Sequence, residues 1–257
     1  MDHDRQNQLI VEQFTAQAEP FAAYAPHSDE DAMRLVREAA GIGPEDVVLD
    51  VACGPGLVAC DFARYAKRVT GVDITPGMID QARKLQASRG LANVDWRVSD
   101  VSRLPFEDAA FTVVFSRYAF HHLLEPSDVL REMARVCRPG GRVVVVDVYS
   151  QDPKQGAAYD AVEKLRDPSH TKALSLDDFA ALYESAGLAM EAPKFYGLDV
   201  KLDDLLQASD PEPGADDEVR RIFRADLGVD RLGVNARVID GEIWFTFPIV
   251  VMVGRRP

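Results

Sequence analysis

The amino-acid sequence predicts an α/β fold in which a mostly parallel, doubly wound sheet has helices on both faces. Short apolar runs, such as Val47 to Ala52 and Val143 to Val148, have the character of strands buried on both faces. Amphipathic helical patterns separate these runs along the chain. Glycines and acidic residues follow the runs, at the edge where such a sheet binds its ligand.

The bulk composition suits one globular α/β domain. The chain has 257 residues, 47% of them hydrophobic, and a formal net charge of −13. An acidic surface repels phosphates and anionic lipids, so we expect no nucleic-acid partner and no membrane insertion. No apolar run reaches the roughly 20 residues that span a bilayer. The three cysteines form no metal-ligand pattern and fit a reducing cytosol, so we expect a cytoplasmic protein without a metal.

The stretch from Val47 to Val58 organises the rest of the chain. It predicts a strand, a tight turn in which Gly54 and Gly56 allow close approach of a ligand, and a helix. The turn fits the dinucleotide pattern G-x-G-x-x-G/A, which is a weak signal alone. Asp50 argues against a dinucleotide, because a carboxylate at the strand end repels a pyrophosphate and attracts a cationic group.

The second predicted strand, 68–72, ends at another acid, Asp73. This residue follows the glycine turn by about twenty positions, where an acid can accept hydrogen bonds from both hydroxyls of a ribose. Thr75 and Pro76 then predict a helix start, with Met78 on the buried side of that helix. The alternative for Asp73 is an exposed loop position.

The third predicted strand, 94–98, leads to Asp100 at the same edge of the sheet. Three acids in order behind one glycine turn indicate a shared ligand pocket. An aspartate in a turn can instead accept hydrogen bonds from its own backbone, and this remains the alternative for Asp100.

These motifs resemble those of class I S-adenosylmethionine-dependent methyltransferases, in the branch of the ubiquinone/menaquinone C-methyltransferases. The resemblance covers about residues 45–190, and its motifs are LDVACGPG (49–56), VTGVDITPGM (69–78) and RLPF (103–106). It implies a Rossmann-like, seven-stranded sheet, mostly parallel with an antiparallel last strand. It also implies the cofactor S-adenosyl-L-methionine, which has an ammonium, a sulfonium and no phosphate, and the product S-adenosyl-L-homocysteine.

The resemblance further implies roles for particular residues. In that family the acid at Asp73 binds the ribose, and apolar residues after it flank the adenine. The acid at Asp100 accepts a hydrogen bond from the adenine amino group, with the Val101 amide nearby. The expected cofactor-binding residues are Asp50, Gly54, Gly56, Asp73, Ile74, Met78, Asp100, Val101 and Ser116.

Histidines follow the fourth predicted strand, 111–115, at the edge where chemistry is expected. A histidine near neutral pH can take a proton from an acceptor hydroxyl or an acidic carbon. If a helix begins here, at most one of His121 and His122 faces the pocket. Further along, Arg166 or His170 could line the acceptor site, or simply belong to a polar turn at a helix end. His121, His122 and His170 are therefore the candidate catalytic residues, with a structural role as the alternative.

We expect one methyltransferase domain over residues 1–257. Its parts would be an amino-terminal helical lid (1–40), a cofactor-binding core (41–148) and acceptor-side inserts (149–174 and 197–240). The lid aromatics that could close the pocket, or only pack helices onto the sheet, are Phe14, Phe21 and Tyr24.

The carboxyl-terminal part predicts the last strands. A sixth strand is expected over 188–196, and Asp240-Gly241 is a hairpin signal. The run 243–253 contains Pro248, so we expect it to supply two strands, the second of them the final antiparallel strand.

The predicted function is methyl transfer from S-adenosylmethionine to a small-molecule acceptor by in-line displacement, with C- or O-methylation favoured. Aligning the acceptor with the methyl group would be the main task of such an enzyme, worth about 7–11 kcal/mol at best. Alternatives are a protein that binds the cofactor without transferring the methyl group, and an NAD-dependent dehydrogenase using the same turn. The sequence leaves open the acceptor, the methylated atom, the need for a base, and the oligomeric state, for which a homodimer is one option.

Overall fold

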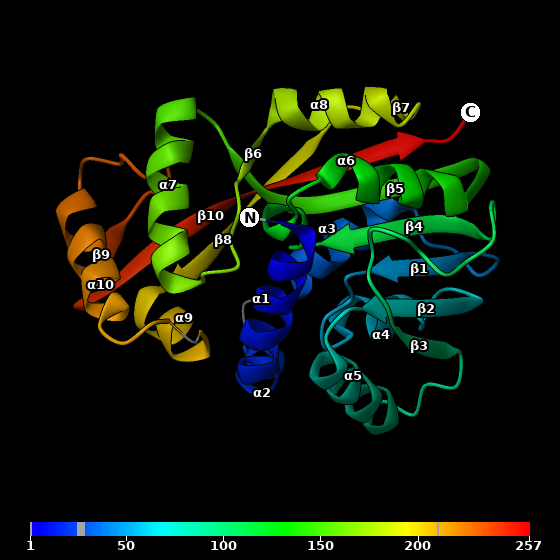
Figure 1. The fold of residues 1–257 in the computed structure, drawn as a ribbon, viewed down its shortest axis with the longest axis horizontal. Helices are drawn as coiled ribbons and strands as arrows, with labels where there is room; N and C mark the ends of the chain where they lie inside the picture. Colours follow the sequence, from blue (N-terminus) through cyan, green and yellow to red (C-terminus); the bar gives the residue numbers. More distant parts are fainter. Residues whose placement is uncertain (1, 25–28, 210) are drawn as a thin grey trace.

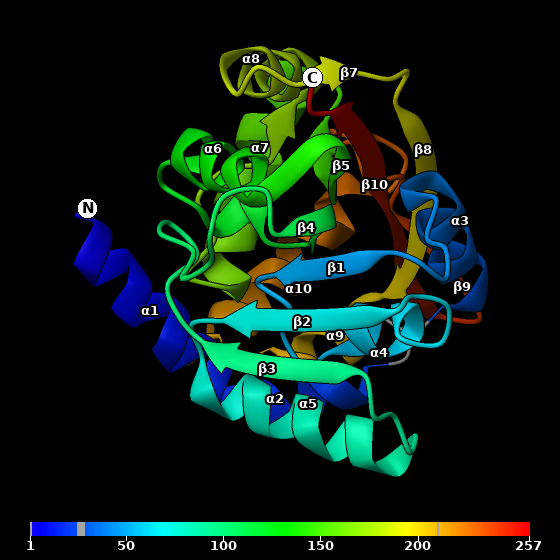
Figure 2. The same ribbon diagram turned by 90° about the vertical axis from the view of Figure 1, so that its right-hand side faces the viewer.

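One sheet runs through the molecule and has its parallel strands at one side (Figures 1 and 2). The structure is a computed structural model that describes residues 2–24, 29–209 and 211–257. Five strands pair in parallel in the order β3-β2-β1-β4-β5. They are β1 (Val47–Val51), β2 (Arg68–Asp73), β3 (Val94–Val98), β4 (Phe111–Arg117) and β5 (Cys137–Ser150).

A long antiparallel strand, β10 (Glu242–Arg255), continues the sheet beside β5. The remaining strands are β6 (Leu174–Ser175), which pairs with β5, and β7 (Ala189–Met190), β8 (Lys194–Lys201) and β9 (Arg237–Ile239), which pair with β10. The predicted fold class is confirmed: the main path of the sheet has seven strands. The strands off this path, β6, β8 and β9, bring the sheet to ten strands in the described part of the chain.

Helices cover both faces of the sheet (Figure 2). Val48 and Leu49 of β1 are both fully buried, yet they belong to different hydrophobic clusters. Residues of α3 (Glu30–Ala40) and α4 (Leu57–Phe62) join the cluster of Val48, and residues of α6 (Pro126–Val136) and α8 (Leu176–Ser185) join that of Leu49. Successive side chains of a strand point to opposite faces, so burial on both explains the continuous apolar runs.

The other helices are α1 (His3–Ala16), α2 (Ala18–Ala23), α5 (Pro76–Ser88), α7 (Pro153–Arg166), α9 (Leu202–Ala208) and α10 (Ala215–Asp226). No helix within the described ranges is long and apolar enough to cross a membrane.

The carboxyl-terminal strands differ in part from the prediction. The predicted sixth strand divides into β7 and β8, and the run 243–253 lies within one continuous strand, so the expected break at Pro248 is wrong. Pairing with β5 begins only at Ile249, so Pro248 lies outside that ladder, and the strand continues through it opposite Gly197 of β8. The predicted hairpin is confirmed: Asp240 and Gly241, both at positive φ, join β9 to β10.

The segment after β4 turns sharply at the carboxyl edge of the sheet. No α-helix begins directly there; a short 3₁₀ helix, η2 (Phe120–His122), precedes α6. Tyr118 has φ of 57°, a backbone conformation that is uncommon for a residue with a side chain. The carboxylate of Asp147, in β5, accepts hydrogen bonds from the amides of Ala119 and Phe120 and so fixes the turn.

The first helix, α1, lies across the carboxyl ends of the parallel strands (Figure 2). Its buried residues are glutamines, Gln6 and Gln13, and Gln17 directly after the helix is also buried. Buried amides require hydrogen-bond partners. This helix therefore covers polar groups at the sheet edge and not only the apolar core.

Candidate active site

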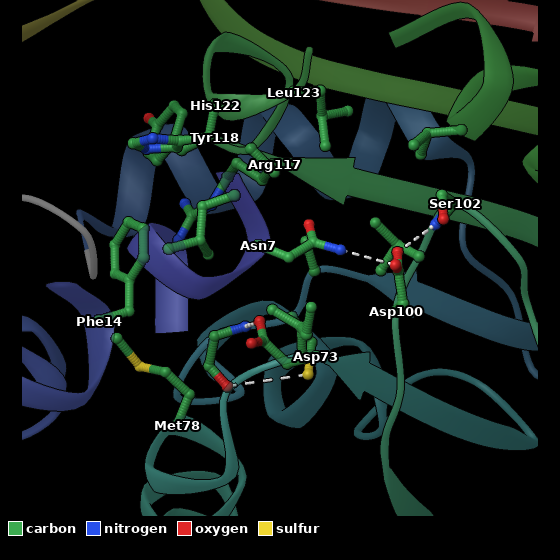
Figure 3. A pocket seen from close by; sticks show the side chains of 18 of the residues that line it. Asn7, Phe14, Asp73, Met78, Asp100, Ser102, Arg117, Tyr118, His122 and Leu123 are labelled. Carbon is green, nitrogen blue, oxygen red and sulfur yellow. Dashed lines mark hydrogen bonds between the residues drawn. The ribbon is translucent and has the colours of Figure 1, made fainter. Parts of the chain in front are cut away.

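A pocket opens at the carboxyl ends of β1, β2 and β4, against α1 (Figure 3). We call it the first cavity; it encloses about 1110 Å³ of empty space, including its open mouth. This is where a doubly wound sheet binds its ligand. The predicted site residues that line the first cavity are Asp50, Gly54, Asp73, Ile74, Met78, Asp100, Val101 and His122.

Asp50 lies at the end of β1 with only 2% of its surface exposed. Its Oδ2 atom has no hydrogen-bond partner among the described residues. Burial raises the pKa of Asp50 to about 7, although the positive charge of Arg117 opposes this shift. Because a buried, unpartnered carboxyl oxygen is unfavourable, a ligand that brings a donor or a positive charge would stabilise this site.

Asp73 ends β2 and holds the glycine turn in place. Its Oδ2 accepts a hydrogen bond of 2.9 Å from the Gly54 amide (Figure 3). Its Oδ1 accepts one of 2.8 Å from the Thr75 amide. Burial raises the pKa of Asp73 in spite of these bonds. Each carboxylate oxygen has a second lone pair, so the residue can still accept hydrogen bonds from a bound ligand.

The carboxylate of Asp100 has two hydrogen-bond partners among the described residues, which Figure 3 shows, and the His3 imidazole lies 4.0 Å from it. Its Oδ1 accepts a hydrogen bond of 2.8 Å from the Ser102 amide, which is the backbone contact that the sequence left open as an alternative. Its Oδ2 accepts one of 2.7 Å from the side-chain amide of Asn7, in α1. The acid therefore lines the first cavity and also ties α1 to the edge of the sheet.

Gly56 and Ser116 lie behind the cavity wall. Gly56 has φ of 79°, and a Cβ atom there would lie 2.5 Å from the ring of Trp96. Only glycine fits this close approach without strain. Ser116 is 1% exposed within β4. Neither residue lines the first cavity, so their roles as ligand contacts stay predictions.

A second cavity adjoins the first across a wall made of Phe14, Tyr118 and His122, which line both. It encloses about 670 Å³, including its opening. Its other walls come mainly from α7, β8, α9 and β10, with apolar and aromatic side chains such as Tyr159, Leu198, Leu205, Phe247 and Ile249.

The adjacent histidines of η2 have different surroundings. His121 lines the second cavity, and its Nδ1 lies 2.5 Å from Oδ1 of Asp147. Burial opposes a charge on His121, but the Asp147 carboxylate outweighs burial and raises the pKa of the imidazole above its ordinary value. Burial, together with the charge of His121, lowers the pKa of His122 to about 3. The pKa values of the two adjacent imidazoles are thus pushed apart, and His121 holds a proton more firmly than His122 does.

His122 is held by a chain of polar groups from the turn after α7. Its Nδ1 lies 3.0 Å from Oγ of Ser169, which donates a hydrogen bond of 2.6 Å to Asp167. Gln6 of α1 fixes this arrangement, because its amide donates to the carbonyl oxygens of both His122 and Ser169.

The other candidates from the sequence lie farther from the first cavity. His170 is buried, has its Nε2 2.8 Å from Oδ1 of Asp160, and lines neither cavity. Arg166 lines the second cavity, as does the lid residue Tyr24. The side chain of Phe21 lies outside the described part of the structure.

Sequence reasoning missed several residues that the structure brings to these cavities. Asp147 had a signal, because an acid inside the apolar run 143–148 needs a buried partner. Ser169 and Asp167 lie between Arg166 and His170, and the sequence analysis selected only those two flanking residues. Asn7 and Gln17 had no signal, since their positions depend on where α1 docks.

The fold and the first cavity define a Rossmann-like nucleoside-binding protein. The carboxyl groups at three successive strand ends suit a ribose and a cationic group and disfavour a pyrophosphate. The orphaned oxygen of Asp50 fits a ligand that carries an ammonium or sulfonium. This ligand chemistry is that of S-adenosylmethionine.

Comparisons with known proteins agree with this class. The family model "Methyltransferase domain" matches residues 49–145. The uncharacterized methyltransferase YcgJ of Bacillus subtilis is 30% identical over 191 residues, which are 74% of this chain and 76% of that protein. The crystal structure of YcgJ from that organism has a TM-score of 0.81 at 26% identity and covers 90% of this chain and 98% of that one. The chain belongs to the S-adenosylmethionine-dependent methyltransferase family, and S-adenosylmethionine is its cofactor.

Some relatives carry a named activity over a shorter shared length. A ubiquinone/menaquinone biosynthesis C-methyltransferase of Desulfotalea psychrophila is 38% identical over 121 residues, 46% of this chain and 48% of that protein. The 27-O-demethylrifamycin SV methyltransferase of Amycolatopsis mediterranei is 33% identical over 174 residues, 64% of this chain and 62% of that protein. The matched relatives thus include enzymes named for carbon and for oxygen methylation.

Proposed function

We propose that this enzyme transfers the methyl group of S-adenosylmethionine to the carbon or oxygen of a small molecule. The first cavity would hold the cofactor and the second the acceptor. The observation that carries the proposal is the wall of Phe14, Tyr118 and His122, which is shared by both cavities. A methyl group must pass between two ligands in line, and adjoining cavities provide that geometry.

Different residues of the first cavity would contact different parts of the cofactor. Asp73 is proposed to accept from the ribose hydroxyls, and Ile74, Met78 and Val101 to flank the adenine. Asp50 would face the cationic end, where its unpartnered oxygen gains a partner. Bound S-adenosylmethionine supplies an electrophilic methyl group on a sulfonium, which is already a good leaving group. The chain itself would therefore act by alignment, and by a base where the acceptor must lose a proton.

The position of α1 supports the proposal that residues 1–40 act as a lid over a core of residues 41–148. The helix contributes Asn7 to the first cavity and Phe14 to both cavities. The segments 149–174 and 197–240 would form the acceptor side, since Tyr159 and Leu205 line the second cavity. The cysteines Cys53, Cys60 and Cys137 are buried thiols, which supports the proposal of a cytoplasmic enzyme.

The experiment is calorimetric titration with S-adenosylhomocysteine and with NAD, followed by turnover assays with phenols, quinols and amines. We expect S-adenosylhomocysteine to bind and NAD to fail, because Asp50 and Asp100 repel a pyrophosphate. Formation of S-adenosylhomocysteine with any acceptor would exclude a protein that only binds the cofactor. Binding of NAD with failure of S-adenosylhomocysteine would contradict the proposal.

A further inference from the structure

We propose that the second cavity binds an uncharged aromatic acceptor through its hydroxyl group, and that His122 removes the hydroxyl proton with the help of Ser169 and Asp167. This inference rests on the proposed function and deepens it by naming the acceptor class. It would make the enzyme an O-methyltransferase for phenol-like molecules.

The charges around the second cavity favour an uncharged acceptor. Arg166 forms a buried salt bridge with Glu163, at 2.6 Å, and also donates a hydrogen bond to Ser209. His121 lines the second cavity and is paired with Asp147, which does not line it. A charged acceptor would thus meet charges that already have partners within the described lining, and would lose its own hydration without replacement.

The walls of the second cavity favour an acceptor that contains an aromatic ring. Aromatic side chains approach from five parts of the chain: α1, the position directly after α2, the turn after β4, α7 and β10. They are Phe14, Tyr24, Tyr118, Tyr159 and Phe247. Tyr159 and Phe247 are already in an edge-to-face arrangement, with ring centroids 6.4 Å apart. Surfaces of this kind bind planar aromatic groups by stacking and edge contacts.

The polar chain behind His122 fixes which of its nitrogens can accept a proton. Burial opposes ionisation of Asp167, but His122, Arg166 and two hydrogen bonds from Ser169 together outweigh it and lower the pKa of this carboxyl, so it is ionised. The Ser169 hydroxyl must therefore donate to Asp167, and its oxygen accepts from Nδ1–H of His122. This leaves the lone pair on Nε2, in a ring that lines both cavities.

The two neighbouring histidines suit complementary roles. His122 is neutral at physiological pH, so its Nε2 lone pair is free, and the charge of Asp167 only partly offsets the burial and the charge of His121 that lower its pKa to about 3. With so low a pKa His122 is a weak base, which takes the proton only as the bond from the acceptor oxygen to the methyl carbon forms. His121 lies beside it, with ring centroids 4.2 Å apart, and Asp147 raises the pKa of His121 in spite of burial. When His121 carries its proton, its positive charge favours an oxyanion over a hydroxyl on the acceptor. Pairs of titratable groups with pKa values pushed apart are typical of acid–base sites.

Gln17 provides a second contact for the acceptor. It is 2% exposed, lines the second cavity, and its Nε2 atom has no hydrogen-bond partner among the described residues. A buried amide without a partner is unfavourable. A second oxygen on the acceptor, such as a neighbouring hydroxyl or carbonyl, would accept this hydrogen bond.

The reaction balances without a further reagent. The hydroxyl proton passes to Nε2 of His122, the acceptor oxygen forms a bond to the methyl carbon, and the carbon–sulfur bond breaks with its electron pair returning to sulfur. The products are a methyl ether, S-adenosylhomocysteine and a proton that His122 returns to solvent.

The acceptor class is tested with matched bicyclic probes: β-naphthol, β-naphthoate, β-naphthylamine and a naphthalenediol with adjacent hydroxyls. We expect methyl ethers from β-naphthol and the diol, and no product from the carboxylate or the amine. Methylation of the amine or carboxylate, a ring-methylated naphthol in place of the ether, or no product from any probe with an enzyme that binds S-adenosylhomocysteine would overturn the inference. Failure to bind S-adenosylhomocysteine would instead refute the proposed function.

The role of Gln17 is tested by binding alone, with S-adenosylhomocysteine present. We expect the diol to bind the wild-type protein more tightly than β-naphthol does, and Gln17→Leu to abolish that difference. A difference that persists in Gln17→Leu would contradict this contact.

The base is tested with acceptors of different acidity. We expect His122→Gln to lower kcat with β-naphthol by about 10²-fold or more. We expect Ser169→Ala to lower it by about tenfold, the rate equivalent of one lost hydrogen bond. Both losses should shrink with a nitro-substituted naphthol whose hydroxyl is already ionised at the assay pH. Ser185→Ala, which removes an exposed hydroxyl on α8, is the matched control and should leave kcat unchanged. Equal losses with both naphthols would mean that His122 and Ser169 act only structurally.

Discussion

Asn7 and Asp100 join the first helix to the ligand edge of the sheet. The side-chain amide of Asn7 donates a hydrogen bond of 2.7 Å to one carboxylate oxygen of Asp100, and both residues line the first cavity. A ligand that uses this oxygen must displace Asn7 or share the carboxylate with it. The contact therefore couples the position of α1 to occupancy of the first cavity.

We predict that Asn7→Ala speeds the association of S-adenosylhomocysteine by about fivefold, the equivalent of one partly exposed hydrogen bond. Stopped-flow fluorescence measures the rate, and hydrogen exchange of α1 should increase in the same variant. Gln8→Ala is the control, because Gln8 bonds to Glu12 on the exposed face of the same helix. An unchanged association rate in Asn7→Ala would show that α1 does not limit entry.

Asp73→Ala should weaken binding of S-adenosylmethionine tenfold or more. The variant loses the proposed ribose contacts, and it also loses the acceptor that holds the Gly54 amide in the glycine turn. Calorimetry provides the affinity, and circular dichroism checks that the variant is folded. Asp95→Ala, on the neighbouring strand and half exposed, should bind like the wild type. Unchanged affinity in Asp73→Ala would remove this residue from the site.

Binding of S-adenosylmethionine should strengthen as pH rises through about 7. Burial raises the pKa of Asp50 to about 7, so in the free protein this carboxyl is partly protonated near neutrality. A cationic ligand binds the ionised carboxylate and lowers its pKa, so binding releases a proton. Titrations in two buffers of different ionisation enthalpy measure that release. Asp50→Asn should abolish the pH dependence, and an equal pH dependence in this variant would assign it to another group.

The same carboxyl should reduce the stability of the unliganded protein at higher pH. Its folded-state pKa exceeds the value of 3.8 for the unfolded chain, so the folded state loses stability as pH rises from about 4 to about 7. The difference between these two pKa values corresponds to about 4 kcal/mol at most. Urea unfolding should therefore show Asp50→Asn to be more stable than the wild type near pH 8, with a smaller gain near pH 4. A gain that is equal at both pH values would refute this account.

Gly71→Ala should destabilise the protein by about 1–3 kcal/mol, because the added methyl group overpacks a filled space. A Cβ atom at Gly71 would lie 2.4 Å from the ring of Trp96, which Gln86 fixes through a hydrogen bond of 2.7 Å. Gly43→Ala is the control for a methyl group with room around it, since the added Cβ atom would meet only Oδ2 of Asp46, at 3.8 Å, and Gly43 is not at positive φ. Thermal unfolding compares the two variants, and a smaller loss for Gly71→Ala would contradict the packing argument.

Local patterns in the sequence were sufficient for the parallel part of the sheet and for the residues at its strand ends. Asp50, Asp73 and Asp100 could be placed at one edge because parallel strands all end there. The prediction at Pro248 was wrong, because this proline lies outside the pairing with β5 and opposite Gly197 of β8, where the strand continues.

The second cavity could not be predicted in the same way. Its walls depend on how α1, α7 and β10 pack together, and the partnership of His122 with Ser169 joins residues 47 positions apart. Gln17, directly after α1, has no distinguishing feature in the sequence, and its place in the cavity depends on how α1 packs. Long-range packing of this kind leaves no periodic signal in a single sequence.

The positions in the chain of the residues that line only the second cavity bear on how substrate choice can evolve. Apart from His121, the residues that line only the second cavity lie outside the span 49–145, which the methyltransferase domain has in common with its relatives. Mutations that remodel α7, β8 or β10 can accumulate without touching the strand ends at Asp50 and Asp73. A gene built on this plan can acquire a new specificity while it keeps its cofactor, and grafting those segments from a relative is a direct route to altered products.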